Sequence, residues 1–439
     1  AIFGDGTIRW YRATDGELLL NLYIDQKTNE WILWTQNGYY ACSKGMDKQL
    51  KWRMNTDKDN ASLVYPFSQY AEKFHNTPLT IMTLFENKSD MELLYERDQL
   101  VRRIDDYQTP PEIKNIQAKE KAENSVQIII EAATISACSP IVYINEKRQN
   151  DITFTKEGTM ITIETGLVTG TNKIAVQLKT ENDILSEPKF LTLNGQQTAS
   201  VHRNLYLLAI GVNKYQKQQP LNYCINDAEK TAQIFEETHE KTRKIYNEQL
   251  ITDENFNEST LNDYIASITG QIKKDDIFIF YYSGHGISSE EEDNQYTFSM
   301  ITAAGEYLPF QKLQEQLETI KAQNMIIMID ACQSGVLADT ITKGIFEDEM
   351  VQLNRKTGIN VFTSSQSKEA SAELKALKHG LFTYSLLNSF YSEDDELISI
   401  REIADNLKEQ IEIICEQQRK TPIYPKILMT GHDFIIGEE

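Results

Sequence analysis

Short apolar, β-prone runs alternate with amphipathic stretches from about residue 200 to the end of the chain. This alternation predicts a mostly parallel sheet of six strands with helices on both faces, and therefore an α/β domain over residues 199–439. The strands are predicted at 205–211, 245–250, 276–282, 325–330, 358–364 and 426–429. The helices are predicted at 225–239, 258–270, 310–321, 380–391 and 400–417.

A different pattern, with short alternating strands and frequent turn residues, precedes this domain. The pair Pro110-Pro111 indicates a domain boundary, and the strands that follow it lie within residues 109–198. About seven short strands in a segment of this length favour an immunoglobulin-like β-sandwich. Six of them are predicted at 125–132, 140–144, 152–155, 160–165, 172–178 and 189–193.

Residues 1–108 form a third region, which is rich in short strands and contains all four tryptophans. Strands at 5–11 and 15–20 are joined by D-G turns, and residues 31–40 predict two strands around an N-G turn. Residues 66–105 are predicted to be helical. The strand pattern resembles the last blade of a WD-repeat propeller, although only one such unit is present.

Composition narrows the class of protein. The chain has 439 residues, of which 40% are hydrophobic and 25% charged, as in soluble globular proteins. A net charge of −21 gives no basic footprint for phosphates, so we expect no nucleic-acid partner. The sequence contains no apolar run of about 18 residues, so we expect no membrane-spanning helix. No signal peptide is visible, although the chain begins within a repeating pattern and a preceding segment stays open.

The five cysteines are far apart, odd in number and without C-x-x-C spacing. This argues for a reducing, cytoplasmic setting and against structural zinc.

Two segments carry candidate chemistry: 281–286 (Y-Y-S-G-H-G) and 329–335 (I-D-A-C-Q-S-G). Each follows an apolar strand, so both are predicted to be loops at the carboxyl edge of the sheet, where α/β proteins place their sites. One loop supplies His285 and the other Cys332. An adjacent imidazole favours the reactive thiolate, so these two residues are a candidate catalytic dyad.

The order and spacing of these motifs resemble a caspase-like cysteine peptidase of the caspase, metacaspase and paracaspase group. The D-x-C-x-S-G form is closest to metacaspases and bacterial caspase-like proteins. The resemblance covers about residues 200–439 and includes segments 205–215, 221–228, 362–365 and 379–384. It implies that Cys332 is the nucleophile, that His285 is the general acid and base, and that backbone N–H groups of Gly286 and Cys332 hold the oxyanion.

The resemblance also bears on specificity. Cleavage after Asp needs arginines in the primary pocket, and no Arg stands at matching places. Metacaspase pockets use acidic and small residues, and four positions match that pattern: Cys224, Asp227, Ser283 and Asp330. Two carboxylates in one pocket favour a guanidinium or ammonium ligand, so we expect cleavage after Arg or Lys. The alternative roles are a helix N-terminal residue for Asp227 and a strand-end residue for Asp330.

Residues 336–357 are predicted to be a loop, and the family often cuts its loop after the nucleophile during activation. Lys343, Arg355 and Lys356 are therefore candidate self-cleavage sites, with ordinary surface charges as the alternative. Calcium-dependent metacaspases carry spaced acidic ligands, whereas residues 290–293 form one acidic run. We therefore expect no metal and no cofactor, with calcium as the less favoured alternative.

The sequence thus predicts a cytoplasmic cysteine endopeptidase, or zymogen of one, acting on protein substrates with basic residues. The β domains are candidate sensors, docking surfaces for a regulatory partner or inhibitory covers. Three alternatives stay open: a silent scaffold, a related peptidase with acidic specificity, and a thiol-transfer protein. The last would favour a resolving cysteine near Cys332, but the nearest following one is Cys415.

Overall fold

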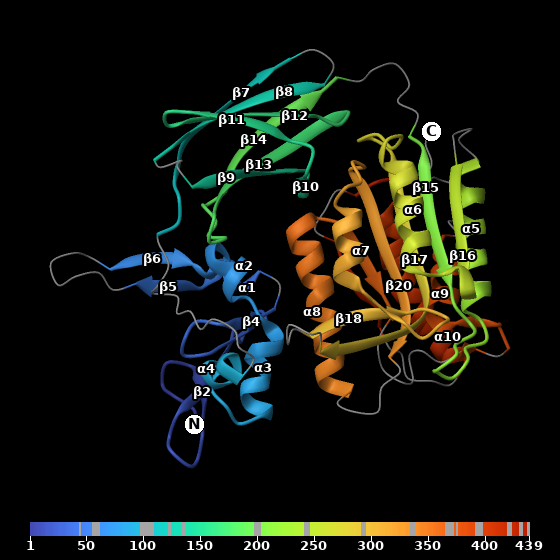
Figure 1. Ribbon diagram of the computed structural model, residues 1–439, viewed down its shortest axis with the longest axis horizontal. Helices are drawn as coiled ribbons and strands as arrows, with labels where there is room; N and C mark the ends of the chain where they lie inside the picture. The colour runs from blue at the N-terminus through green and yellow to red at the C-terminus, as the bar shows by residue number, and fades with distance from the viewer. Residues whose placement is uncertain are drawn as a thin grey trace.

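The chain folds into three regions, which Figure 1 shows in a computed structural model. We refer to them as the N-terminal region (residues 1–96), the two-sheet unit (109–196) and the α/β region (203–436). The described residues are 1–43, 45–54, 62–96, 109–121, 124–133, 137–196, 203–240, 246–290, 296–333, 339–364, 373–374, 376–390, 398–418, 424–429 and 433–436.

The α/β region is built on one sheet with the strand order β16-β15-β17-β20-β21-β24. Neighbours from β16 to β21 are parallel, whereas β24 is antiparallel to β21. The predicted count of six strands is wrong, because β18 and β19 extend the sheet from the end of β17 and bring the described strands to eight. The strands are β15 (Leu205–Gly211), β16 (Tyr246–Thr252), β17 (Ile277–Glu290), β18 (Tyr296–Ile301), β19 (Tyr307–Pro309), β20 (Asn324–Gln333), β21 (Asn360–Thr363) and β24 (Lys426–Leu428).

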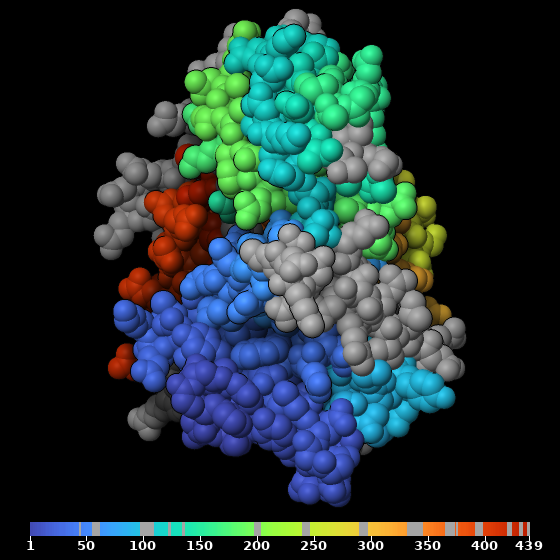
Figure 2. All heavy atoms as spheres, turned by 90° about the vertical axis from the view of Figure 1, so that its left-hand side faces the viewer, coloured from blue at the N-terminus to red at the C-terminus, as the bar shows by residue number. Residues whose placement is uncertain are grey.

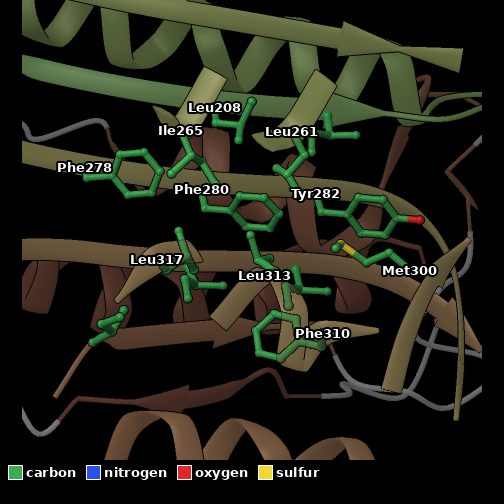
Figure 3. Packing of buried hydrophobic residues seen from close by; sticks show 14 of the residues in the cluster. Leu208, Leu261, Ile265, Phe278, Phe280, Tyr282, Met300, Phe310, Leu313 and Leu317 are labelled. Atoms are coloured by element: carbon green, nitrogen blue, oxygen red, sulfur yellow. The ribbon is translucent and has the colours of Figure 1, made fainter. Parts of the chain in front are cut away.

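Alternate side chains of the central strands face opposite sides of the sheet. In β17, Phe278, Phe280 and Tyr282 join one hydrophobic cluster with helices α6, α7 and α8, part of which Figure 3 shows. Ile277 and Ile279 join a second cluster with α5, α9 and α10. The helices are α5 (Cys224–Glu240), α6 (Glu258–Thr269), α7 (Phe310–Leu317), α8 (Asp339–Thr357), α9 (Leu381–Asn388) and α10 (Ile400–Gln417).

Helix α8 replaces most of the loop predicted over 336–357. Phe346, Met350 and Leu353 are buried in the first cluster, and their spacing of four and three residues places them on one helical stripe. Charged residues between them hide this stripe in the sequence. Two short elements, β22 (Glu373–Leu374) and β23 (His379–Gly380), pair before α9, and the 3-10 helix η3 (Asp253–Asn255) precedes α6.

The two-sheet unit contains two antiparallel sheets with the orders β10-β9-β13-β14 and β11-β12-β8-β7. Buried residues from both sheets, such as Ile128 and Val176, form one hydrophobic cluster. Burial alternates along β8 and β12, as the sequence pattern predicts. The strands are β7 (Ile113–Glu120), β8 (Ser125–Ala132), β9 (Cys138–Ile144), β10 (Lys147–Gln149), β11 (Thr153–Glu157), β12 (Met160–Gly166), β13 (Gly170–Thr180) and β14 (Lys189–Gly195).

The N-terminal region combines a four-stranded sheet in the order β1-β2-β3-β4 with a β5-β6 ribbon and short helices. The helices predicted over 66–105 are short and broken, and residues 97–105 lie outside the described part of the chain. The elements are β1 (Thr7–Tyr11), β2 (Leu18–Ile24), β3 (Trp31–Trp34), β4 (Tyr40–Cys42), α1 (Met46–Gln49), β5 (Lys51–Met54), β6 (Leu63–Pro66), η1 (Phe67–Tyr70), α2 (Ala71–Phe74), α3 (Thr77–Phe85) and α4 (Asp90–Glu96).

The two-sheet unit docks on the α/β region through the turn and strand that follow β9. Gln323 Nε2 donates to Ile144 O at 2.6 Å, and Asn150 Nδ2 donates to Glu318 O at 2.9 Å. A Cβ on Gly358, just after α8, would overlap Glu146 O, so the turn is seated directly on the end of this helix. Figure 2 shows the N-terminal region and the two-sheet unit stacked on the same side of the molecule. No helix in the described ranges combines the length and apolar character needed to cross a membrane.

Candidate active site

The two candidate segments lie side by side as paired strand ends. Strand β17 continues through Glu290 and β20 through Gln333, so the predicted loops are wrong over these residues. The parallel register matches His285 with Cys332 and Gly286 with Gln333. Neighbouring strands in a sheet lie about 4.8 Å apart, so the backbones of His285 and Cys332 are adjacent. The Cys332 side chain lies outside the described part of the chain.

His285 is fixed by hydrogen bonds on its backbone and on one ring nitrogen. Its Nε2 lies 2.7 Å from Gln219 O, and its N–H donates to the Tyr215 hydroxyl at 2.8 Å. Because a carbonyl oxygen only accepts, Nε2 carries the proton in this bond and Nδ1 keeps a free lone pair. Among the described residues, His285 Nδ1 is buried and has no hydrogen-bond partner. The ring can therefore take up a proton at Nδ1.

Two tyrosines support this arrangement. The Tyr282 hydroxyl donates to His285 O at 2.7 Å, and the Tyr215 ring lies 4.6 Å from the His285 ring between centroids. Burial raises the pKa of Tyr215, so its hydroxyl stays protonated. A Cβ on the intervening Gly284 would lie 2.6 Å from Tyr282 Oη and 2.7 Å from Tyr215 Oη, so glycine is needed there.

The four predicted pocket residues lie around the same sheet edge. Asp227 is in the first turn of α5, one turn after Cys224, and both are buried. Ser283 pairs with Asp330 in the strand register, and its hydroxyl lies 3.5 Å from Asp227 Oδ2. The structure therefore brings Asp227, Ser283 and Asp330 together, while Asp227 also occupies the helix-start position given as its alternative role.

The two carboxylates converge on Gly380. A Cβ built there would lie 2.8 Å from Asp330 Oδ2 and 3.3 Å from Asp227 Oδ2, so only glycine fits without displacing a carboxylate. The Gly380 N–H donates to Asp227 Oδ2 at 3.2 Å, and the Thr383 hydroxyl donates to Asp330 Oδ2 at 2.7 Å. Among the described residues, neither carboxylate has a Lys or Arg partner.

Burial dominates the electrostatics of this pair. Burial raises the pKa of Asp227 to about 7, with a further increase from the nearby Asp330, while hydrogen bonding to His379 opposes the rise. His379 Nδ1 lies 2.6 Å from Asp227 Oδ1. Burial also raises the pKa of Asp330, against the hydrogen bond from Thr383. The surroundings of both carboxylates thus favour their neutral form.

Sequence reasoning assigned no role to Tyr215, Gln219, His379, Gly380 or Thr383. All but Gln219 lie inside the segments that carry the family resemblance, and their place in those segments is the sequence signal that could have pointed to them. Gln219 acts through its backbone carbonyl, which no side-chain pattern reveals.

Comparison with protein families decides the class. A model of the caspase domain of peptidase family C14 matches residues 205–429, which is more than half of the chain. The chain belongs to the caspase family. Its caspase domain coincides with the α/β region, and the residues that carry the candidate chemistry all fall inside the matched range.

Three solved structures are similar to this chain at low identity. A protein from Geobacter sulfurreducens is 18% identical with a TM-score of 0.37, and the match covers 54% of this chain and 94% of that chain. The structure of pro-sf-caspase-1 is 10% identical with a TM-score of 0.35, covering 52% and 92%. The Drosophila initiator caspase Dronc is 10% identical with a TM-score of 0.35, covering 55% and 85%. No curated protein matches the chain significantly.

The candidate self-cleavage residues Lys343, Arg355 and Lys356 lie within helix α8 of the caspase domain. The Lys343 side chain is outside the described part of the chain. Arg355 Nη1 lies 3.2 Å from Asp47 Oδ2, and Lys356 Nζ lies 3.4 Å from Glu72 Oε2. Cleavage after Arg355 or Lys356 would require the end of α8 to unwind and the ion pair of that residue to separate.

The described residues contain no group of three or more His, Cys, Asp or Glu side chains arranged to hold a metal ion. Residues 291–293 of the acidic run considered for calcium lie outside the described ranges.

Proposed function

We propose that this caspase-family protein is a cysteine endopeptidase that uses Cys332 and His285. The observation that carries the proposal is the buried Nδ1 of His285, which has no hydrogen-bond partner among the described residues. Nε2 is committed to Gln219 O, and the backbone of His285 is in register with Cys332. An imidazole held in this way supports a thiolate on the neighbouring strand.

The proposed reaction is acyl transfer. The Cys332 thiolate attacks the substrate carbonyl, and His285 Nδ1–H protonates the leaving amine as the thioester forms. Water then attacks the thioester while Nδ1 accepts its proton, which releases a carboxylic acid and regenerates the Cys332 thiolate and the protonated imidazole. Backbone N–H groups of Gly286 and Cys332 are the proposed oxyanion donors, and losing one such donor would cost about 3 kcal/mol of transition-state stabilisation.

We further propose that the substrate residue before the cleaved bond is Arg or Lys. Support comes from two buried carboxylates, Asp227 and Asp330, that converge on Gly380 and have no Lys or Arg partner among the described residues. A guanidinium would neutralise them and donate N–H hydrogen bonds to their carboxylate oxygens. Acidic specificity would instead require a cation in this pocket.

The test is hydrolysis of matched fluorogenic peptides ending in Arg, Lys or Asp, with and without calcium. Cys332→Ala and His285→Ala are the variants, and Cys415→Ala is the matched control because Cys415 is a buried residue of α10 in the second hydrophobic cluster. We expect turnover of Arg and Lys peptides that the two site variants lose and the control retains.

Turnover of Asp peptides alone would contradict the pocket and leave the dyad standing. Absence of turnover for the wild type under every condition, together with no reaction of Cys332 with a peptidyl chloromethylketone, would instead favour a catalytically silent scaffold.

The accessory regions suggest how such a peptidase is controlled. We propose that the enzyme is of metacaspase type, is made as a cytoplasmic zymogen and responds to a protein partner at its accessory regions. The order β1-β2-β3-β4 supports a terminal WD-repeat blade, and the paired sheets of the two-sheet unit support an immunoglobulin-like domain.

A further inference from the structure

Helix α8 has two occupied faces on opposite sides. Phe346, Met350 and Leu353 face the core of the caspase domain. Asp348, Gln352 and Arg355 form a second stripe, with spacings of four and three residues, that faces the N-terminal region. Figure 1 shows α8 between the N-terminal region and β18. The helix also begins shortly after Gln333, the last residue of the strand that carries Cys332.

The contact with the N-terminal region is polar and largely buried. Thr77 Oγ1 donates to Asp348 Oδ1 at 2.7 Å, and Arg355 pairs with Asp47, whose side chain is only 4% exposed. Removing Arg355 would leave the buried Asp47 carboxylate without this partner, so the contact favours one position of α8.

The inner side of α8 holds β18. Glu349 Oε2 accepts a hydrogen bond from the Phe298 backbone N–H at 2.9 Å. The Phe346 ring meets the Phe298 ring edge-on, with centroids 4.3 Å apart and planes at 65°. Both the backbone and the side chain of Phe298 are therefore set by α8.

Phe298 in turn sets the backbone next to His285. Strand β18 pairs with β17, matching Phe298 with Ser288 and Met300 with Gly286. The Phe298 ring fills the volume that a Cβ on Gly286 would occupy. Any displacement of this ring therefore changes the space available to the His285–Gly286 backbone.

We propose that Phe346 and Glu349 are positioning residues that align the His285–Gly286 backbone through Phe298, and that the N-terminal region sets this alignment through α8. The inference rests on the proposed function, because the quantity being aligned is the position of His285 relative to Cys332. Docking of the N-terminal region thereby becomes a requirement for full reactivity of the thiol.

Glu349→Ala removes the acceptor for the Phe298 N–H, whereas Glu349→Gln retains an acceptor oxygen. Lys312→Ala is the matched control, because Lys312 pairs with Glu258 on the exposed side of α6 and α7. We expect kcat for an Arg peptide to fall about tenfold in Glu349→Ala with KM unchanged, because small misplacements of reacting groups cost this much or more. Glu349→Gln should recover most of the loss.

A second readout is independent of the substrate: the pH profile of Cys332 alkylation by iodoacetamide, followed by peptide mass spectrometry. An aligned imidazole lowers the midpoint of this profile, and Glu349→Ala should move it toward that of a free thiol, about pH 8.5. A Glu349→Ala variant with wild-type kcat and midpoint would overturn the inference. So would a loss that Glu349→Gln fails to rescue.

Coupling to the N-terminal region is tested with Asp47→Asn alone and combined with Glu349→Ala. If both act through α8, Asp47→Asn lowers kcat and shifts the alkylation midpoint, and the double variant is little worse than Glu349→Ala. A variant that lowers Tm but leaves kcat and the midpoint unchanged would overturn the coupling.

The failure of the proposed function has a different outcome. A wild-type midpoint equal to that of a free thiol, with no peptide turnover, would refute the dyad and the alignment together. A low wild-type midpoint that is insensitive to Glu349→Ala would refute the alignment alone.

Discussion

Asp227 and Asp330 destabilise the folded state when they are ionised, because both are buried. The proposed recognition of a basic substrate residue nevertheless depends on their ionised form. Burial raises the pKa of Asp227 to about 7, from an ordinary value of 3.8. The protonated form is therefore favoured in the folded state, and the stability that this provides is present below pH 3.8 and lost as pH rises through about 7. A guanidinium, by contrast, needs the ionised form.

Because the pKa of Asp227 is raised and a guanidinium needs its ionised form, binding of a basic substrate should strengthen as pH rises. We predict that KM for an Arg peptide falls up to about tenfold per pH unit as pH rises toward 7, and then levels off as Asp227 becomes ionised. Measuring KM separately from kcat distinguishes substrate binding from the chemical step. A flat KM between pH 5 and 8 would contradict the prediction.

Substituting the carboxylate should separate stability from recognition. Asp227→Asn is expected to lower kcat/KM for Arg peptides about a hundredfold or more, because a charge-assisted pair is lost. Its Tm at pH 8 should match or exceed that of the wild type, since a buried charge has been removed, and this advantage should shrink toward pH 5. Thermal unfolding at both pH values checks it, and a lower Tm at pH 8 would contradict it.

For single residues, the sequence predicts the candidate site residues better than it predicts the residues that form hydrogen bonds with them. Asp227, Ser283 and Asp330 meet because parallel strand ends and the first turn of α5 share one edge of the sheet. His379 and Gly380 follow a stretch without a clear period, so their approach to Asp227 depends on tertiary packing that no local pattern encodes.

Among the elements, β17 differs most from the pattern that predicts it. The apolar run predicts a strand ending near 282, but pairing continues to Glu290 because β18 folds back on it. Gly284 and Gly286, which favour a loop in isolation, are tolerated in the strand because Tyr282 and Phe298 fill the space beside them. Helix α8 was missed for a related reason: its apolar stripe is narrow and interrupted by acidic residues.

Glycine at 286 is a packing requirement of this strand. Gly286→Ala is predicted to destabilise the protein by about 1–3 kcal/mol, because its Cβ would overlap the Phe298 ring. Gly270→Ala is the matched control, since Gly270 has a φ of −80° and no atom within 4 Å of an added Cβ. Urea unfolding of both variants measures the difference, and equal midpoints would contradict the prediction.

For the whole molecule, changes in hydrophobic period along the chain predict the order of the three regions. They do not predict how the regions dock on one another. Contacts such as Gln323 with Ile144 and Thr77 with Asp348 join residues that are more than 170 positions apart. They depend on the fit between finished surfaces, and single polar side chains at such contacts look like ordinary surface residues in the sequence.

Docking of the two-sheet unit on the caspase domain buries Lys147, and this burial lowers the free energy of unfolding at neutral pH. Lys147 is 7% exposed at the junction of the two-sheet unit and the caspase domain, and burial lowers its pKa to about 8, from an ordinary value of 10.5. Because the lysine pKa is lowered in the folded state, the neutral amine contributes stability above pH 10.5. This contribution is lost as pH falls through about 8. Lys147→Met should therefore stabilise the protein at pH 7 by on the order of 2 kcal/mol.

Thermal and urea unfolding at pH 7 and pH 10.5 check this expectation, because the gain should largely vanish at the higher pH. Lys312→Met, at an exposed position, is the control and should change little. A Lys147→Met variant that is less stable than the wild type at pH 7 would show that the ammonium has a favourable role in the junction.

The ion pair between Arg355 and Asp47 also provides a way to detect whether the N-terminal region is docked on α8. Trypsin needs an extended backbone and a free basic side chain, and the paired end of α8 offers neither while the N-terminal region is in place. A cut after Arg355 or Lys356 would therefore mark a molecule that had come apart at this junction. Counting such cuts by mass spectrometry after a brief digestion should give the undocked fraction, which we expect to rise in Asp47→Asn.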